Sequence, residues 1–154
     1  MASETDIEFP ADDAFWGLVE LAREDWPGFE KRLRELSTPV IAGFGHMFFA
    51  LEAELAERSR LLIASEDGAD DFCGWVVACG KDGYMRALAD PDSLDAAYVA
   101  RFDRDERRGA SVAVRYEAEQ VYHERTGEDL CPFVEPAFDP YDSEVYGPVI
   151  RGRG

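Results

Sequence analysis

Acidic side chains gathered in residues 66–92 are the first candidates for chemistry in this chain of 154 residues. Glu66, Asp67, Asp70 and Asp71 lie close together along the sequence. Ca²⁺ and Mg²⁺ are bound by several clustered oxygen ligands, so this group is a candidate metal site. It lacks the alternating acidic ligands and central glycine of an EF-hand loop. Helix capping and interaction with the helix dipole are the alternative explanation for two of its members.

A second acidic pair, Asp90 and Asp92, flanks Pro91 just before a helix expected to start at Ser93. Turns before helices favour these residue types, which explains the pair without chemistry. A catalytic carboxylate pair is the alternative, because such a pair requires only the correct spatial separation.

Sequence motifs typical of zinc enzymes, nucleophilic hydrolases and nucleotide-binding enzymes are missing from the chain. His46 and His123 do not form H-x-x-x-H or H-E-x-x-H, and no nucleophile elbow, phosphate loop or G-x-G-x-x-G is found. The three cysteines lack zinc-site spacing and fit a reducing compartment. We therefore predict no catalytic residue and no cofactor, and an enzymatic role has no support in these motifs.

The charge of the chain limits the classes of molecule that it is expected to bind. Thirty-three acidic against 16 basic residues give a formal net charge of −17. Such a surface repels nucleic-acid phosphates and anionic membranes, and it attracts basic proteins. The sequence contains no apolar run near the roughly 20 residues needed to span a bilayer. Since the N-terminus also lacks the pattern of a secretory signal, we expect a cytoplasmic protein.

Apolar residues recur with a period of 3.6, which predicts an all-α single compact domain of six to seven helices. The helical domain is expected over residues 12–127, after an acidic N-terminal arm over residues 1–11. Four helix starts are predicted from capping residues: Asp12 or Asp13, Thr38, Asp70 or Asp71, and Ser93.

The longest helix is expected to follow Thr38 and to bury one continuous apolar face. Glu52, Glu54, Glu57 and Arg58 are predicted to point towards water. Gly43 and Gly45 are expected to permit the close approach of another helix. A last, charged helix over residues 105–124 carries five apolar or aromatic residues: Val112, Val114, Tyr116, Val121 and Tyr122.

Residues 128–154 form a tail of a different kind. Prolines at 132, 136, 140 and 148 exclude a regular helix and favour an extended chain, giving an irregular Pro-rich C-terminal wrap. Its aromatic residues either pack along the domain as a belt or form an arm that binds a partner.

Four short blocks suggest a relationship. They read F-W-G-L-V at 15–19, F-C-G-W-V-V at 72–77, A-L-A-D-P-D-S-L at 87–94 and V-Y-H-E-R-T-G-E-D-L at 121–130. In these blocks and their order the chain resembles a bacterial family known as domain of unknown function 4240. The resemblance implies a small helical cytosolic protein and supplies no activity. Cys73 departs from it, because the family block has arginine there.

The leading hypothesis is a protein-binding module, an immunity-type inhibitor or regulatory adaptor that engages a basic protein partner. Its predicted contact residues are Asp70, Asp71, Asp90, Asp92, Phe138 and Tyr141. One alternative is a metal-dependent or carboxylate-based enzyme that uses the acidic residues 66–92. A further alternative is a DNA-mimic inhibitor, whose carboxylates imitate phosphates.

Overall fold

Six α-helices make up most of the chain that the computed structural model describes, residues 7–59, 66–90, 110–130 and 146. In chain order they are α1 (Asp12–Glu24), α2 (Trp26–Glu35), α3 (Thr38–Ser59), α4 (Glu66–Ala78), α5 (Lys81–Ala89) and α7 (Ala110–Thr126). The described residues contain no strand, which confirms the predicted all-α fold. The helix expected from Ser93 and, apart from Tyr146, the Pro-rich wrap lie outside the described residues.

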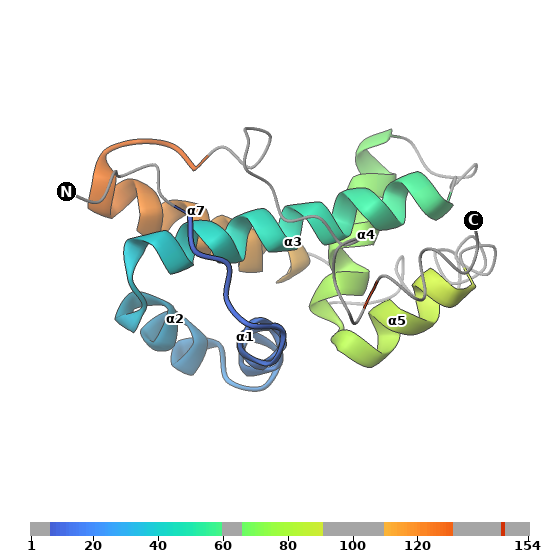
Figure 1. Cartoon of the computed structure of the whole chain (residues 1–154), viewed down its shortest axis with the longest axis horizontal. Coiled ribbons are helices and arrows are strands. Elements are labelled where there is room, and N and C mark those ends of the chain that lie inside the picture. Colours follow the sequence, from blue (N-terminus) through green and yellow to red (C-terminus); the bar gives the residue numbers. More distant parts are fainter. Residues whose placement is uncertain (1–6, 60–65, 91–109, 131–145, 147–154) are drawn as a thin grey trace.

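The long helix α3 organises the molecule (Figure 1). Helices α4 and α7 both pack against α3 and also against each other. Helices α1 and α2 pack together beneath one half of α3, while α5 continues from the lower end of α4 (Figure 1). Side chains from distant parts of the sequence therefore meet along α3.

Helix ends follow local chemistry in several places. The carboxylate of Asp25 caps α2 by accepting a hydrogen bond of 3.1 Å from the Gly28 amide. Gly80 has a φ of 111° between α4 and α5, and Gly127 has a φ of 73° after α7. This backbone region is strained for residues with a Cβ atom, so glycine suits both positions.

Three predicted caps are wrong. Helix α1 begins at Asp12 after Ala11, and α3 begins at Thr38, so Asp12 and Thr38 are first helical residues. Helix α4 begins at Glu66, which places Asp70 and Asp71 inside the helix. Carboxylates in a first turn interact favourably with the helix dipole, which explains how an acidic sequence can begin a helix without capping it.

The glycines in α3 do permit close approach, although the neighbours are not helices. A Cβ atom at Gly43 would clash with the backbone carbonyl of Glu8, and one at Gly45 would clash with the Leu130 side chain. The Glu8 amide donates to the Pro39 carbonyl at 3.0 Å, so the segment before α1 lies along the start of α3.

An aromatic core lies where α1, α3 and α5 meet, formed by Phe15, Trp16, Phe44, Tyr84 and Tyr146. The ring centroids of Phe15 and Phe44 are 5.2 Å apart, and Tyr84 meets Tyr146 edge to face at 5.9 Å. Tyr146 is fully buried, so this residue of the expected tail belongs to the core.

Helix α4 is buried on all sides over residues 72–77. Phe72, Trp75 and Val76 lie on one side of this helix, and Cys73 and Val77 on the other side are buried as well. A helix that is apolar all round must be covered all round, and α4 contacts α3, α7, α5 and α1.

None of the described helices is both long enough and apolar enough to cross a membrane.

Candidate functional site

The acidic residues singled out in the sequence fall at the start of α4. Glu66, Asp67, Asp70 and Asp71 occupy its first two turns, where the helical spacing pairs Glu66 with Asp70 and Asp67 with Asp71. Their side chains lie outside the described part of the structure. Among the side chains that are described, no group of three or more His, Cys, Asp and Glu residues could hold a metal ion.

The other predicted contact residues are only partly described. Asp90 ends α5, is exposed, and donates its backbone amide to the Arg86 carbonyl at 3.1 Å. It lies with α4 and α5 at the end of the molecule opposite α2 (Figure 1). Asp92, Phe138 and Tyr141 lie outside the described residues.

Two carboxylates of α3 that were predicted to face water are buried. Glu52 is 8% exposed and Glu54 is 6% exposed. Arg115 of α7 reaches Glu52 with an N···O distance of 2.8 Å, and Arg58 lies 3.3 Å from Glu54. A buried carboxylate is costly without a partner, so these two arginines explain why the acidic side chains can lie inside.

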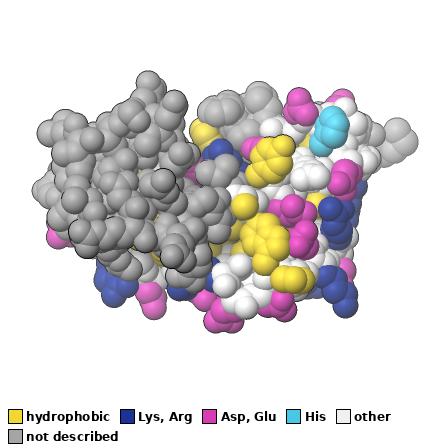
Figure 2. Space-filling model, turned by 180° about the vertical axis from the view of Figure 1, so that it is seen from behind, with side chains coloured by type: hydrophobic (Ala, Val, Ile, Leu, Met, Phe, Trp, Pro, Cys, Tyr) yellow, Lys and Arg dark blue, Asp and Glu magenta, His cyan; other side chains and the backbone are white. Residues whose placement is uncertain are grey.

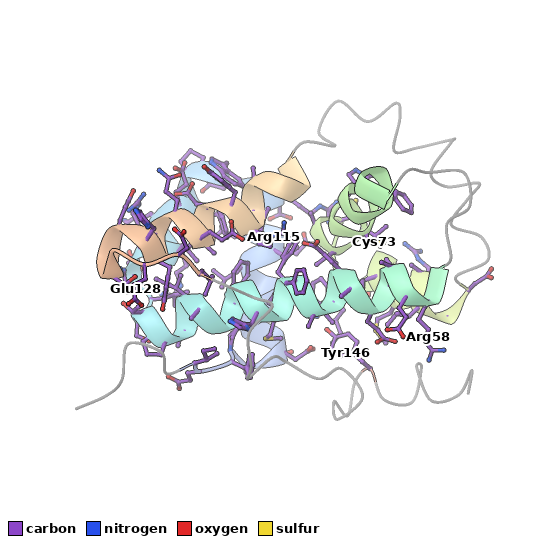
Figure 3. All side chains as sticks on the ribbon, turned by 90° about the horizontal axis from the view of Figure 1, so that it is seen from above. Arg58, Cys73, Arg115, Glu128 and Tyr146 are labelled. Atoms are coloured by element: carbon purple, nitrogen blue, oxygen red, sulfur yellow. The ribbon has the colours of Figure 1, made fainter. Side chains whose placement is uncertain are left out.

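Arg115 extends from α7 towards α3 (Figure 3). Besides Glu52 it lies 3.6 Å from Glu119, and its guanidinium is 5.9 Å from the centre of the Phe49 ring. Gly74 of α4 faces the Glu52 carboxylate, and a Cβ atom there would be only 3.4 Å from it. Only the fold could reveal the ion pair between Arg115 and Glu52, because the two residues are 63 positions apart in the sequence.

The outward face of α7 carries an exposed aromatic ring. Tyr116 is 61% exposed, and no other large hydrophobic side chain among the described residues is exposed. Gln120 and His123 follow it one and two turns along the helix and are also exposed. The sequence grouped Tyr116 with the apolar residues of this helix, whereas Val114, Ala118, Val121 and Tyr122 form its buried side. We call Tyr116, Gln120 and His123 the outer face of α7.

Carboxylates border the outer face of α7 on both sides. Glu117 lies towards α2, and Glu119 lies towards Arg115. Burial raises the pKa of the Glu117 carboxyl group, Glu30 and Glu124 raise it further, and Arg34 opposes them. Burial also raises the pKa of Glu119, against the influence of Arg115 and with that of Asp129. For both carboxyl groups, burial and neighbouring carboxylates disfavour the ionised form more than the nearby arginine favours it.

Ion pairs and hydrogen bonds fasten the inner edge of α7 to α2. Arg34 lies 2.7 Å from Glu124 and 3.5 Å from Glu117. The hydrogen bond from Arg34 lowers the pKa of the Glu124 carboxyl group. Arg125 donates to the Leu36 carbonyl at 2.6 Å and also to the Arg34 carbonyl, which satisfies the end of α2. Arg34 and Arg125 thus join α7 to α2.

The histidines have different surroundings. His46 lies in α3 and is buried among core residues. His123 is exposed near the end of α7, where its Nδ1 atom lies 3.2 Å from the Asp129 carboxylate. Neither lies in a group of described side chains that could hold a metal ion.

A hydrogen-bonded cluster links the aromatic core to the surface. The Trp16 indole donates to the Tyr146 hydroxyl, which in turn donates to the Asp12 carboxylate at 2.9 Å. Lys81 lies 2.7 Å from the other oxygen of Asp12. Burial raises the pKa of the Tyr84 and Tyr146 hydroxyls. These partners satisfy the polar atoms of Trp16 and Tyr146, so the cluster has a structural role.

The fold and these surfaces define a small, acidic, all-α protein whose aromatic core is enclosed by helices. The chain belongs to the family described as protein of unknown function (DUF4240), whose model matches residues 11–124. The resemblance seen in the four sequence blocks is thereby confirmed. No curated protein and no solved structure matches the chain. Membership establishes kinship and assigns no activity.

Cys73, where the resemblance led us to expect arginine, is fully buried in α4. It lies close enough to Tyr84 to contribute to the raised pKa of that hydroxyl. Position 73 therefore presents no charged group at the surface of this protein.

Proposed function

We propose that this protein is a cytoplasmic protein-binding module, an immunity-type inhibitor or regulatory adaptor, that engages a basic protein partner. The observation that carries the proposal is the outer face of α7, where Tyr116 is exposed between Glu117 and Glu119. Aromatic residues are enriched at protein interfaces because a ring contributes much contact area at a small entropic cost.

The surface around this face supports the same role. Figure 2, which views the molecule from behind, shows hydrophobic side chains interspersed with acidic ones over the described half. This side carries α7, which lies behind α3 in Figure 1, and α2, which lies below α3. A mixture of apolar and acidic groups suits a partner that is basic and also contributes apolar contacts.

The net charge of −17 adds a long-range attraction for such a partner. Complementary charges accelerate association, and dissolved salt screens the attraction over about 10 Å at 0.1 M ionic strength. Binding driven in this way is expected to weaken as salt rises, which supplies a direct test.

The test is capture of the partner from a lysate of the native host on the tagged full chain. The beads are washed at about 0.1 M and then about 0.5 M salt, and each fraction is analysed by mass spectrometry. We expect a stoichiometric basic protein that remains at low salt and is released at high salt. The tag alone and an unrelated acidic protein of similar net charge are the controls. Recovery of no specific partner would contradict the proposal.

A further inference from the structure

The outer face of α7 combines an exposed ring with carboxylates on both borders. Tyr116 supplies the ring, Glu117 borders it towards α2, and Glu119 borders it on the opposite side. The face of an aromatic ring attracts cations, and carboxylates beside it add charge-assisted hydrogen bonds. Arginine provides both contacts, since its planar guanidinium stacks on rings and donates in a fixed fork.

A half-buried position between α7 and α3 already contains this combination. The guanidinium of Arg115 lies 5.9 Å from the centre of the Phe49 ring and 2.8 Å from the Glu52 carboxylate. An arginine therefore uses a ring and a carboxylate together on the inner side of α7. On the outer face the Tyr116 ring is exposed, and the Glu119 carboxylate beside it is partly exposed.

Among the described residues, the cations nearest the outer face contact its bordering carboxylates and leave the Tyr116 ring exposed. Arg34 lies 3.5 Å from Glu117 and 2.7 Å from Glu124. Arg115 lies 3.6 Å from Glu119 and 2.8 Å from Glu52. The pKa values of Glu117 and Glu119 are raised by burial and by neighbouring carboxylates. An added cation would reduce that crowding of negative charge, so the electrostatics favour a basic group from outside.

On the basis of the function proposed above, we propose that the outer face of α7 is the docking surface for the partner. The partner places an arginine side chain over the Tyr116 ring, with its guanidinium between Glu117 and Glu119. The partner is thus a protein that presents an arginine-bearing basic segment.

Binding of a synthetic arginine-rich peptide to the ¹⁵N-labelled full chain tests this placement. Chemical-shift changes locate the peptide, and titration gives its affinity at about 0.1 M salt. We expect the largest shifts in residues 113–124 of α7. Tyr116→Ala is expected to weaken binding about fivefold, the size of an exposed cation–π contact, whereas Tyr116→Phe keeps the ring and the affinity.

Two further arms separate specific docking from general attraction. Glu119→Gln and Asp82→Asn change the net charge equally, but Asp82 is an exposed residue of α5. We expect Glu119→Gln to weaken peptide binding more than Asp82→Asn does. A lysine-rich peptide of the same length is expected to bind less tightly than the arginine-rich one, because lysine lacks the planar fork.

The outcomes distinguish this inference from the proposed function. If Tyr116→Ala binds the peptide as tightly as the wild type, or the shifts concentrate outside α7, the docking surface is wrong. Capture of a basic protein by both the wild-type and Tyr116→Ala baits would leave the proposed function standing without this surface. Absence of any peptide binding would overturn the inference, and an empty capture experiment would overturn the function itself.

Discussion

The aromatic core and the outer face of α7 both contain tyrosine, but they use it in opposite ways. Tyr84 and Tyr146 are fully buried, and their hydroxyls bond to the Leu51 carbonyl and the Asp12 carboxylate. Tyr116 on the outer face is 61% exposed. The comparison separates side chains that stabilise the fold from one whose contact area remains available to a partner.

The largest effect is expected inside the core. Phe15→Ala removes a buried ring that packs on Trp16 and Phe44, and the cavity should lower the free energy of unfolding by about 3–5 kcal/mol. Urea denaturation measures the change. A loss below about 1 kcal/mol would show that the core tolerates the cavity and would weaken the contrast with α7.

High pH should destabilise the core through its tyrosines. Burial raises the pKa of Tyr84 and Tyr146 in the folded protein, so above about pH 10 the unfolded chain loses protons that the folded protein retains. The stability present below that pH should then fall by about 1.4 kcal/mol per pH unit for each tyrosine.

Unfolding free energies measured from pH 9 to 11 check this slope, about one unit either side of an ordinary tyrosine pKa. Tyr84→Phe should reduce the slope by the contribution of one tyrosine. Tyr116→Phe, which removes a hydroxyl from an exposed ring, is the matched control and should leave it unchanged. Equal slopes in all three proteins would contradict the predicted role of the buried hydroxyls.

The ion pair between Arg115 and Glu52 joins α7 to α3. Arg115→Met leaves the buried Glu52 carboxylate without this partner, which should cost about 2 kcal/mol, less than for a fully buried pair because Arg115 is partly exposed. Thermal and urea unfolding measure the loss. The double variant Glu52→Met with Arg115→Met should recover most of it. A double variant as unstable as the single one would show that packing, rather than charge, accounts for the contribution of Arg115 to stability.

A small effect of opposite sign is expected at the border of the outer face. The raised pKa of Glu117 means that its ionised form is disfavoured by folding, and this penalty disappears as pH falls through the raised pKa. Glu117→Gln should therefore stabilise the protein at pH 7 by less than about 0.5 kcal/mol, and the gain should shrink towards pH 4.5, near the ordinary pKa of glutamate. Asp82→Asn is the charge-matched control. A clear destabilisation at pH 7 would show that the Arg34 contact outweighs the crowding.

The smallest effect on stability is expected at Tyr116 itself. Tyr116→Ala should change the free energy of unfolding by no more than about 0.5 kcal/mol, because most of the ring is already in water. Urea denaturation beside Phe15→Ala makes the comparison direct. A loss comparable to that of Phe15→Ala would place Tyr116 in the core and remove the basis for the docking surface.

The periodic placement of apolar residues was sufficient to predict the helices and much of the core. The longest helix was expected to follow Thr38, and α3 (Thr38–Ser59) is the longest of the described helices. Val114, Val121 and Tyr122 were counted among the apolar residues of the last helix, and all three are buried. These features depend on near neighbours in the chain, which is why a single sequence reveals them.

Helix caps were harder to predict, because a carboxylate can form ion pairs and hydrogen bonds with residues that are distant in the sequence. Asp12 was expected to cap α1, whereas its oxygens bond to Lys81 and Tyr146. The burial of Glu52 depends in the same way on Arg115, a residue of another helix. The acidic residues chosen as a site remain a prediction, since apart from the exposed Asp90 their side chains lie outside the described part of the chain.

The sequence by itself determined the all-α class, the acidic character and the family relationship, because composition, periodicity and short motifs are local properties. Only the tertiary structure decided which polar groups are buried and which aromatic ring is exposed. Val114 and Tyr116 lie two positions apart on one charged helix, yet only Tyr116 faces solvent. That difference arises because α2, α3 and α4 cover one side of α7 and leave Tyr116 uncovered, an arrangement set by packing between distant segments.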